Sequence, residues 1–169
     1  FDTVGMTPDF PFGYGMGYTT FTVEPMAFTA DAKQVTVTAL VKNTGATAGK
    51  EVVQVYYSAP DGVVDCPYQE LAGFAKTREL QPGRQEEVTV SFATESMAGY
   101  DMARAAYVMN AGFYYVRVGN SSRNTKIAGA IHLDAEAVVE QNRNICGESG
   151  FTDLKPEKHG ITDAKEAEG

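Results

Sequence analysis

The chain has 169 residues and a formal net charge of -8, with two cysteines and no tryptophan. A domain of this size buries roughly two-thirds of its unfolded surface, so it needs no disulfide scaffold, and Cys66 and Cys146 match no metal-binding spacing. The negative charge opposes binding to nucleic acid or anionic lipid, and no apolar run approaches the roughly 20 residues of a membrane span. We therefore expect neither nucleic-acid nor membrane partners.

Residues 1–17 are predicted to connect two domains. The chain begins at Phe1 with neither a methionine nor a signal peptide, which indicates a piece of a longer protein. Aromatic residues and glycines then alternate in FPFGYGMGYTTF, residues 10–21. A dinucleotide fingerprint needs such glycines before a helix, but a strand pattern follows here, so we reject a nucleotide site. The rings are instead predicted to contact a neighbouring domain, and this assignment covers Phe10, Phe12, Tyr14 and Tyr18.

Residues 18–134 show a dominant side-chain period of two, which is the period of a strand with one face on a core. In KQVTVTALVKNTG, residues 33–45, every second side chain is apolar, and Asn43 and Gly45 then favour a turn. About seven short strands are expected, in segments that begin near Lys33, Lys50, Tyr68, Glu86, Arg104, Phe113 and Thr125.

The segments RAAYVMN and FYYVRVG flank Ala111 and Gly112, and this arrangement predicts a hairpin between the two strands. No long helical pattern interrupts the strands. Residues 18–134 are therefore predicted to form an antiparallel β-sandwich.

The pattern changes after Asp134. This residue is a candidate N-cap, apolar residues recur up to Cys146, and Gly147 is a stop signal, so we expect a short amphipathic helix. The remaining residues are polar and mixed in charge, and they cannot order themselves by burial. We assign residues 135–169 to this helix and to a polar linker or arm.

No residue stands out as catalytic or metal-binding, and nothing in the sequence requires a cofactor. Hydrolysis of a glycoside uses two carboxyl groups roughly 5 to 9 Å apart across a pocket, but the acidic residues lie in expected turns or at a strand start. These are Asp31, Asp61, Glu86, Glu87, Glu95 and Asp101. His132 and His159 have no ligand-spaced neighbours, and the sequon at Asn120 fits a turn after a strand.

Four segments between Phe10 and Ser122 carry specific combinations of residues. They read FPFGYGMGYTTF, VKNTGATAGKEVVQVYYSAP, QELAGFAKTRELQPGRQEEVTVSF and AGFYYVRVGNSS. In this order they resemble the fibronectin type III-like domain of family 3 glycoside hydrolases, the β-glucosidase and β-xylosidase group. The chain departs from the family pattern at Gly17, where serine is common, and at residues 110–112, where a proline-glycine-glutamate turn is common.

The resemblance implies a fibronectin type III/immunoglobulin-like sandwich that lacks catalytic residues of its own. In this family the aspartate nucleophile belongs to a TIM-like barrel, and the acid/base carboxylate usually belongs to an α/β domain. Neither domain is in this sequence, so we carry over no catalytic residue. The implied partners are the α/β and TIM-barrel-like domains of a parent enzyme.

Two functional classes follow for the chain. The first is a non-catalytic structural module that supports a retaining β-glycosidase, and the second is an independent carbohydrate-binding or adhesion module that stacks sugars on exposed tyrosine rings. About 35 residues follow the last expected strand, which is long for a structureless loop in a compact domain. Some family members place the sandwich before the barrel, and we expect that order here; the gene sequence downstream of Gly169 decides it.

Overall fold

A computed structural model describes residues 2, 5–145, 147 and 150. Within these residues the chain forms ten strands and the short 3-10 helix η2 (Thr94–Met97), and every strand pair is antiparallel. The prediction of an all-β, antiparallel fold is therefore confirmed. No helix in this described part has the length and apolar character needed to cross a membrane.

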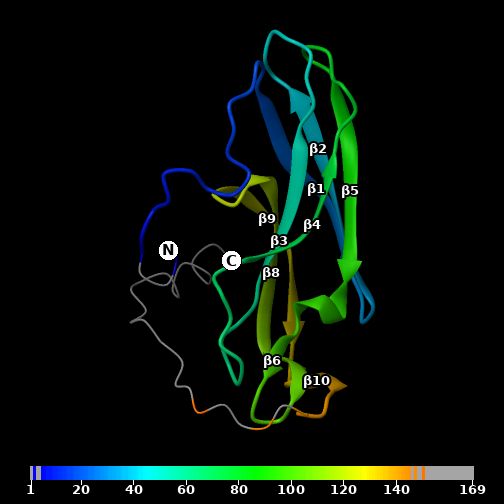
Figure 1. Ribbon diagram of the computed structural model, residues 1–169. Helices are drawn as coiled ribbons and strands as arrows, with labels where there is room; N and C mark the ends of the chain where they lie inside the picture. Colours follow the sequence, from blue (N-terminus) through cyan, green and yellow to red (C-terminus); the bar gives the residue numbers. More distant parts are fainter. Residues whose placement is uncertain (1, 3–4, 146, 148–149, 151–169) are drawn as a thin grey trace.

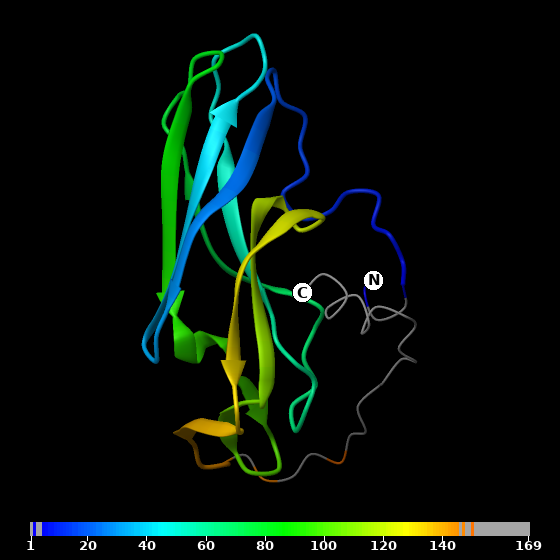
Figure 2. The same ribbon diagram turned by 180° about the vertical axis from the view of Figure 1, so that it is seen from behind.

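Seven of the strands form two main sheets. The first sheet has the order β1-β2-β5 and the second the order β4-β3-β8-β9. Figures 1 and 2 show the two sheets as long layers that lie side by side. Their strands are β1 (Phe21–Ala30), β2 (Gln34–Asn43), β3 (Val52–Ser58), β4 (Glu70–Lys76), β5 (Gln85–Ala93), β8 (Gly112–Ser121) and β9 (Asn124–Leu133).

The core lies between these two sheets and consists mainly of alternating valines. On β2 the buried side chains alternate with partly exposed or exposed ones, as the period of two predicts. The facing strands β3 and β8 supply further buried valines, and the Tyr57 ring stacks on Phe92 with 6.5 Å between centroids. Burial of each such valine stabilises the fold by roughly 1.5 kcal/mol or more. This shared core holds the two sheets together.

Asn43, at the end of β2, is fully buried and joins several loops. Its Nδ2 donates to the carbonyl oxygens of Thr47 and Leu80, each at 2.8 Å. Its Oδ1 accepts from Thr19 Oγ1 at 2.7 Å and from the Gly45 amide at 3.0 Å. Each polar atom of the amide is therefore paired, which is the condition for burying it without penalty.

A third, smaller sheet lies beyond one end of the main layers, with the order β10-β7-β6. Its strands are β6 (Gly99–Asp101), β7 (Ala106–Met109) and β10 (Ala137–Gln141). The prediction of an amphipathic helix after Asp134 is wrong, because β10 occupies part of that segment and pairs with β7. A short apolar run such as Val138–Val139 fits either a helix or a strand. Here a strand is favoured because valine is β-branched and because one edge of β7 is open for pairing. The polar tail 151–169 lies outside the described residues.

The prediction of a hairpin around Ala111 and Gly112 is also wrong, because β7 and β8 belong to different sheets. Between them, Asn110 Nδ2 donates to the carbonyl oxygens of Pro60 at 2.9 Å and Val64 at 2.8 Å. These bonds attach the β7–β8 link to the β3–β4 loop. The chain therefore crosses between sheets here, and Gly112 accommodates the crossing with a φ of 128°.

We predict that Asn43→Ala lowers the free energy of unfolding by about 3 kcal/mol, because it leaves several buried donors and acceptors unpaired. Thr38→Ala is the control, since it removes an exposed hydroxyl that pairs with Thr89, and it should change the free energy by less than about 0.5 kcal/mol. Denaturant unfolding measures both. Equal effects for the two variants would contradict the role of Asn43.

Candidate interdomain surface

Residues 6–20 run along the outside of the two main sheets before the chain enters β1, and Figure 1 shows this connector in blue. Few backbone hydrogen bonds hold it there. The Ser122 amide donates to the Phe12 carbonyl at 2.8 Å, and the Thr44 amide donates to the Thr20 carbonyl at 2.8 Å. A further bond from the Tyr14 amide to the Pro11 carbonyl, 2.9 Å long, closes a turn within the connector. The backbone is thus fixed at both ends of the aromatic stretch.

The connector rings are exposed although its backbone is attached. The exposed fractions are 74% for Phe10, 65% for Phe12, 57% for Tyr14 and 98% for Tyr18. The Phe10 and Tyr14 rings also contact each other, with centroids 5.2 Å apart and planes tilted by 55°. Large apolar rings gathered on an attached segment are typical of an interaction surface.

Two hollows border the connector, and different rings line each of them. The first is a groove of about 490 Å³, and its lining includes Phe10 and Phe12 of the connector together with Tyr56 and Leu71 of the second main sheet. The second is a more polar hollow of about 530 Å³, lined by Tyr14 and by polar residues of the connector, of the segment before β3 and of the adjoining ends of β8 and β9. Tyr18 lines neither hollow. The structure therefore brings Phe10 and Phe12 to one site, places Tyr14 at another and leaves Tyr18 apart.

The polar hollow contains a short hydrogen-bond chain. Asn124 Nδ2 donates to Asn120 Oδ1 at 2.8 Å, and Asn120 Nδ2 donates to Glu51 Oε2 at 3.1 Å. The other carboxylate oxygen of Glu51 accepts from the Val52 amide at 2.8 Å. Both Glu51 oxygens and both Asn120 side-chain atoms are therefore held in fixed orientations.

Gly13 lets the connector lie close to the second main sheet. Its φ is +87°, a conformation that residues with a side chain rarely adopt. A Cβ atom at this position would lie 2.4 Å from Gln54 Nε2 and 2.8 Å from the Asn120 carbonyl oxygen. The sequence therefore needs glycine here for both conformation and space.

Leu71 is part of this surface but was not predicted from the sequence. It lies on β4, where the register shifts between Leu71 and Gly73, and with Phe74 it is one of two exposed large apolar residues of that strand. The segment that contains β4 is apolar on both faces and broken by a glycine. The exposed face of such a strand cannot be identified without knowing its partners.

Three of the acidic residues considered above, Asp31, Glu86 and Asp101, accept hydrogen bonds from nearby groups. Asp31 Oδ1 accepts from the amides of Lys33 and Gln34, at 2.7 and 2.8 Å, and these bonds lower the pKa of the carboxyl group. Glu86 accepts from Arg78 at 3.0 Å, and Asp101 pairs with Arg104, which likewise lowers the pKa of Asp101. Each of these three carboxylates is therefore engaged in a turn or an ion pair, and the lowered pKa values of Asp31 and Asp101 are the opposite of what a general acid needs.

The histidines are equally uninformative about chemistry. The His132 ring lies 4.5 Å from the Phe113 ring, and its Nδ1 is 3.0 Å from Asp134 Oδ1. His159 lies outside the described residues. Within the described part of the chain, no group of three or more histidine, cysteine, aspartate or glutamate residues is placed to hold a metal ion.

Comparison with known proteins gives consistent matches. Residues 51–122 match the fibronectin type III-like domain family. Among curated relatives, β-glucosidase A of Butyrivibrio fibrisolvens is 38% identical over 156 residues, which cover 80% of this chain and 19% of the relative. The β-glucosidase of Ruminococcus albus is 39% identical over 137 residues, covering 78% of this chain and 14% of the relative.

Solved structures match over a similar part of the chain. β-Glucosidase 3B from Thermotoga neapolitana, solved with α-D-glucose, has a TM-score of 0.74 and 42% identity, and the match covers 82% of this chain and 19% of that one. A β-glucosidase from Paenibacillus barengoltzii has a TM-score of 0.76 and 39% identity, with coverage of 80% and 16%. The chain thus spans less than a fifth of the length of these proteins.

We predict that Gly13→Ala detaches the connector, because the new methyl group would overlap Gln54 and the Asn120 carbonyl and would strain the backbone by roughly 1–2 kcal/mol. Hydrogen exchange of the Ser122 amide, which donates to Phe12, should become several-fold faster. Gly15→Ala is the matched control, since a Cβ atom there meets nothing within 4 Å. Unchanged exchange in Gly13→Ala would show that the connector tolerates a side chain at this point.

Proposed function

We propose that the chain, whose residues 51–122 match the fibronectin type III-like domain family, is a non-catalytic accessory module of a family 3 β-glycosidase. One observation carries the proposal. The matches to β-glucosidases cover about four-fifths of this chain but less than a fifth of each relative. The parent protein then has room for separate catalytic domains and hydrolyses β-linked glycosides with them.

The finer assignment of the fold is part of this proposal. We assign the two main sheets to a fibronectin type III/immunoglobulin-like sandwich, which typically has about seven strands in two antiparallel sheets. The Tyr114 hydroxyl donates to the Asn110 carbonyl at 3.0 Å, four residues upstream, as in the tyrosine corner of such folds. Burial raises the pKa of Tyr114 to about 12, because removal from water disfavours the ionised phenolate.

The connector and its rings are assigned to domain contacts. Residues 1–17 then link this sandwich to an α/β domain of the parent enzyme, and a TIM-barrel-like domain is the second partner. Exposed rings on a fixed backbone support this role, because burial of Phe10 and Phe12 at an interface would stabilise the assembly without a cost in backbone order.

We predict that the double variant Phe10→Ser with Phe12→Ser weakens domain coupling in the parent enzyme. The melting temperature or the cooperativity of the parent should fall and kcat should drop, whereas unfolding of this chain alone should change by less than about 0.5 kcal/mol because both rings are exposed. Phe113→Ser is the control, because Phe113 is an exposed ring near the start of β8, whereas the connector meets the other end of that strand. Equal destabilisation of chain and parent would contradict an interdomain role.

A second candidate function is carbohydrate binding, and the hollow beside Tyr14 is the observation that favours it. An exposed aromatic ring lies there next to fixed carboxylate and amide groups of Glu51, Asn120 and Asn124. Sugars bind proteins through such a combination of ring stacking and hydrogen bonds.

Titration of the chain with β-linked gluco-oligosaccharides, followed by amide chemical shifts, separates the two functions. The accessory role predicts no saturable response at millimolar sugar and no hydrolysis of an aryl β-glycoside by the purified chain. Saturable shifts confined to the Tyr14 hollow, abolished by Tyr14→Ala, would instead establish the binding module. If Tyr18→Ala alone abolished the saturable shifts, sugar would bind at neither hollow, since Tyr18 lines neither of them.

A further inference from the structure

The segment after β9 is attached to the sandwich in an unusual way. It lies beyond the residues that match the family, and it forms β10, which pairs with β7 of the small sheet and with no strand of the two main sheets in the described chain. Figure 1 shows β10 beyond one end of the main layers, whereas the β8–β9 turn, which the connector meets through the bond from the Ser122 amide to the Phe12 carbonyl, lies at the other end of β8. The connector thus contacts one end of β8, and β10 lies near the other.

Apolar packing does little to hold β10. The strand has five residues, its register shifts between Val138 and Glu140, and Val138 is 52% exposed. Val139 packs against the main core, but a hollow of about 390 Å³ lies beside it, lined also by Glu95 and Tyr107. So short and exposed a strand has little stability of its own. Backbone pairing with β7 and polar side-chain contacts therefore carry most of its attachment.

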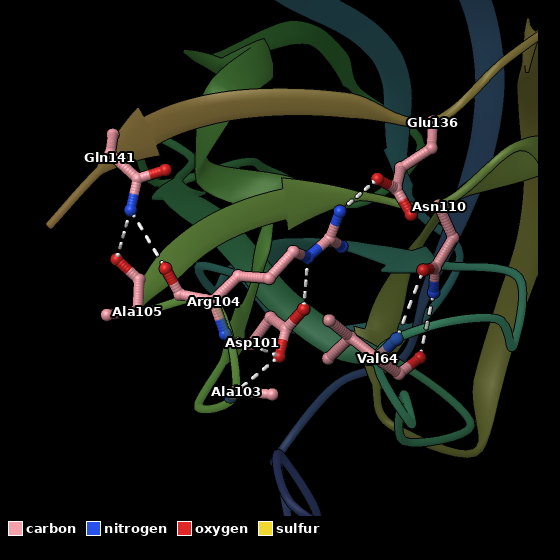
Figure 3. Close-up of polar contacts among 8 residues, drawn as sticks. All are labelled: Val64, Asp101, Ala103, Arg104, Ala105, Asn110, Glu136 and Gln141. Atoms are coloured by element: carbon pink, nitrogen blue, oxygen red, sulfur yellow. Dashed lines mark hydrogen bonds and ion pairs between the residues drawn. The ribbon is translucent and has the colours of Figure 1, made fainter.

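The polar contacts lie at both ends of the strand, as Figure 3 shows. Before β10, Glu136 Oε1 accepts from Arg104 Nη1 at 2.5 Å, while Arg104 Nε also pairs with Asp101. At the end of β10, Gln141 Nε2 donates to the carbonyl oxygens of Arg104 at 2.8 Å and Ala105 at 3.1 Å. All of these bonds converge on residues 101–105, which comprise the last residue of β6 and the turn that leads into β7.

The backbone of this turn is shaped to receive the Gln141 amide. Ala105 has a φ of 49°, and it is the one residue other than glycine with a positive φ in the described chain. This left-handed conformation costs roughly 1–2 kcal/mol for alanine. In this turn the carbonyl oxygens of two successive residues, Arg104 and Ala105, both accept from the side-chain amide of Gln141. The Ala105 carbonyl also accepts from the Asn142 amide at 2.8 Å. The strained residue therefore contributes two of the contacts that end the segment.

We infer that Arg104, Glu136 and Gln141 form an exit anchor that fixes the direction in which the chain leaves the sandwich. The anchor binds the chain on both sides of β10, so it restrains direction as well as position. Residues 142–145 then start from a defined orientation relative to the two main sheets. This inference goes beyond the proposed accessory role, because it concerns the chain's own residues and holds whatever follows them.

Exchange of amide hydrogens in the 169-residue chain tests the anchor. Glu136→Gln and Gln141→Ala should each accelerate exchange of the β10 and Asn142 amides about two- to fivefold, the range expected for losing a partly exposed polar contact. Exchange in β2 should not change. Glu140→Gln, which removes an exposed carboxylate outside the anchor on the same strand, is the matched control.

A distance measurement tests the direction of exit. Spin labels at Ile145→Cys and Glu87→Cys, in a background with Cys66→Ser and Cys146→Ser, should give one narrow distance distribution in the otherwise unchanged chain and a broad one in Glu136→Gln. An equally narrow distribution in Glu136→Gln and Gln141→Ala would overturn the inference. So would equal acceleration of exchange in β2 and β10, because the residues would then act on global stability alone. Should Gln141→Ala fail to fold, Glu136→Gln carries both tests.

Discussion

The buried side chain of Asn43 is the constraint on which the arrangement of loops around the sandwich depends. A fully buried amide is tolerated when every donor and acceptor is paired, and here the partners come from the connector, from the following turn and from the segment before β5. The amide therefore fixes three loops relative to β2. Since Thr19 is one of the partners, the same amide also fixes where the connector joins the first main sheet.

The sequence predicted those strands that bury one face, because burial of one face makes apolar and polar residues alternate along the strand. The valines of β2 alternate, and they lie in the core as expected. The sequence failed where pairing partners decide the outcome. The valines after Asp134 fit a helix or a strand equally well until the edge of β7 is known, and the hairpin at Ala111 fails because Asn110 binds the β3–β4 loop.

The candidate surface was predictable to a similar degree. Phe10, Phe12, Tyr14 and Tyr18 were identified because rings and glycines alternate without forming a strand, and all four rings are exposed. Their division between two hollows was not predictable, because it depends on which loops the connector crosses. Leu71 was missed for the same reason, since it comes from a strand about sixty residues away and meets Phe10 and Phe12 through the fold alone.

The connector and the segment around β10 are held by different physical means, and this difference bears on what the module can do. The connector is fixed by backbone hydrogen bonds and a buried amide, which leaves its rings free for a partner surface. The exit is fixed by partly exposed charged and amide side chains, because so few apolar residues of β10 reach the core. A module anchored at both ends can set the relative placement of two neighbours. A sandwich with an anchored connector and a loose exit could place one neighbour at most.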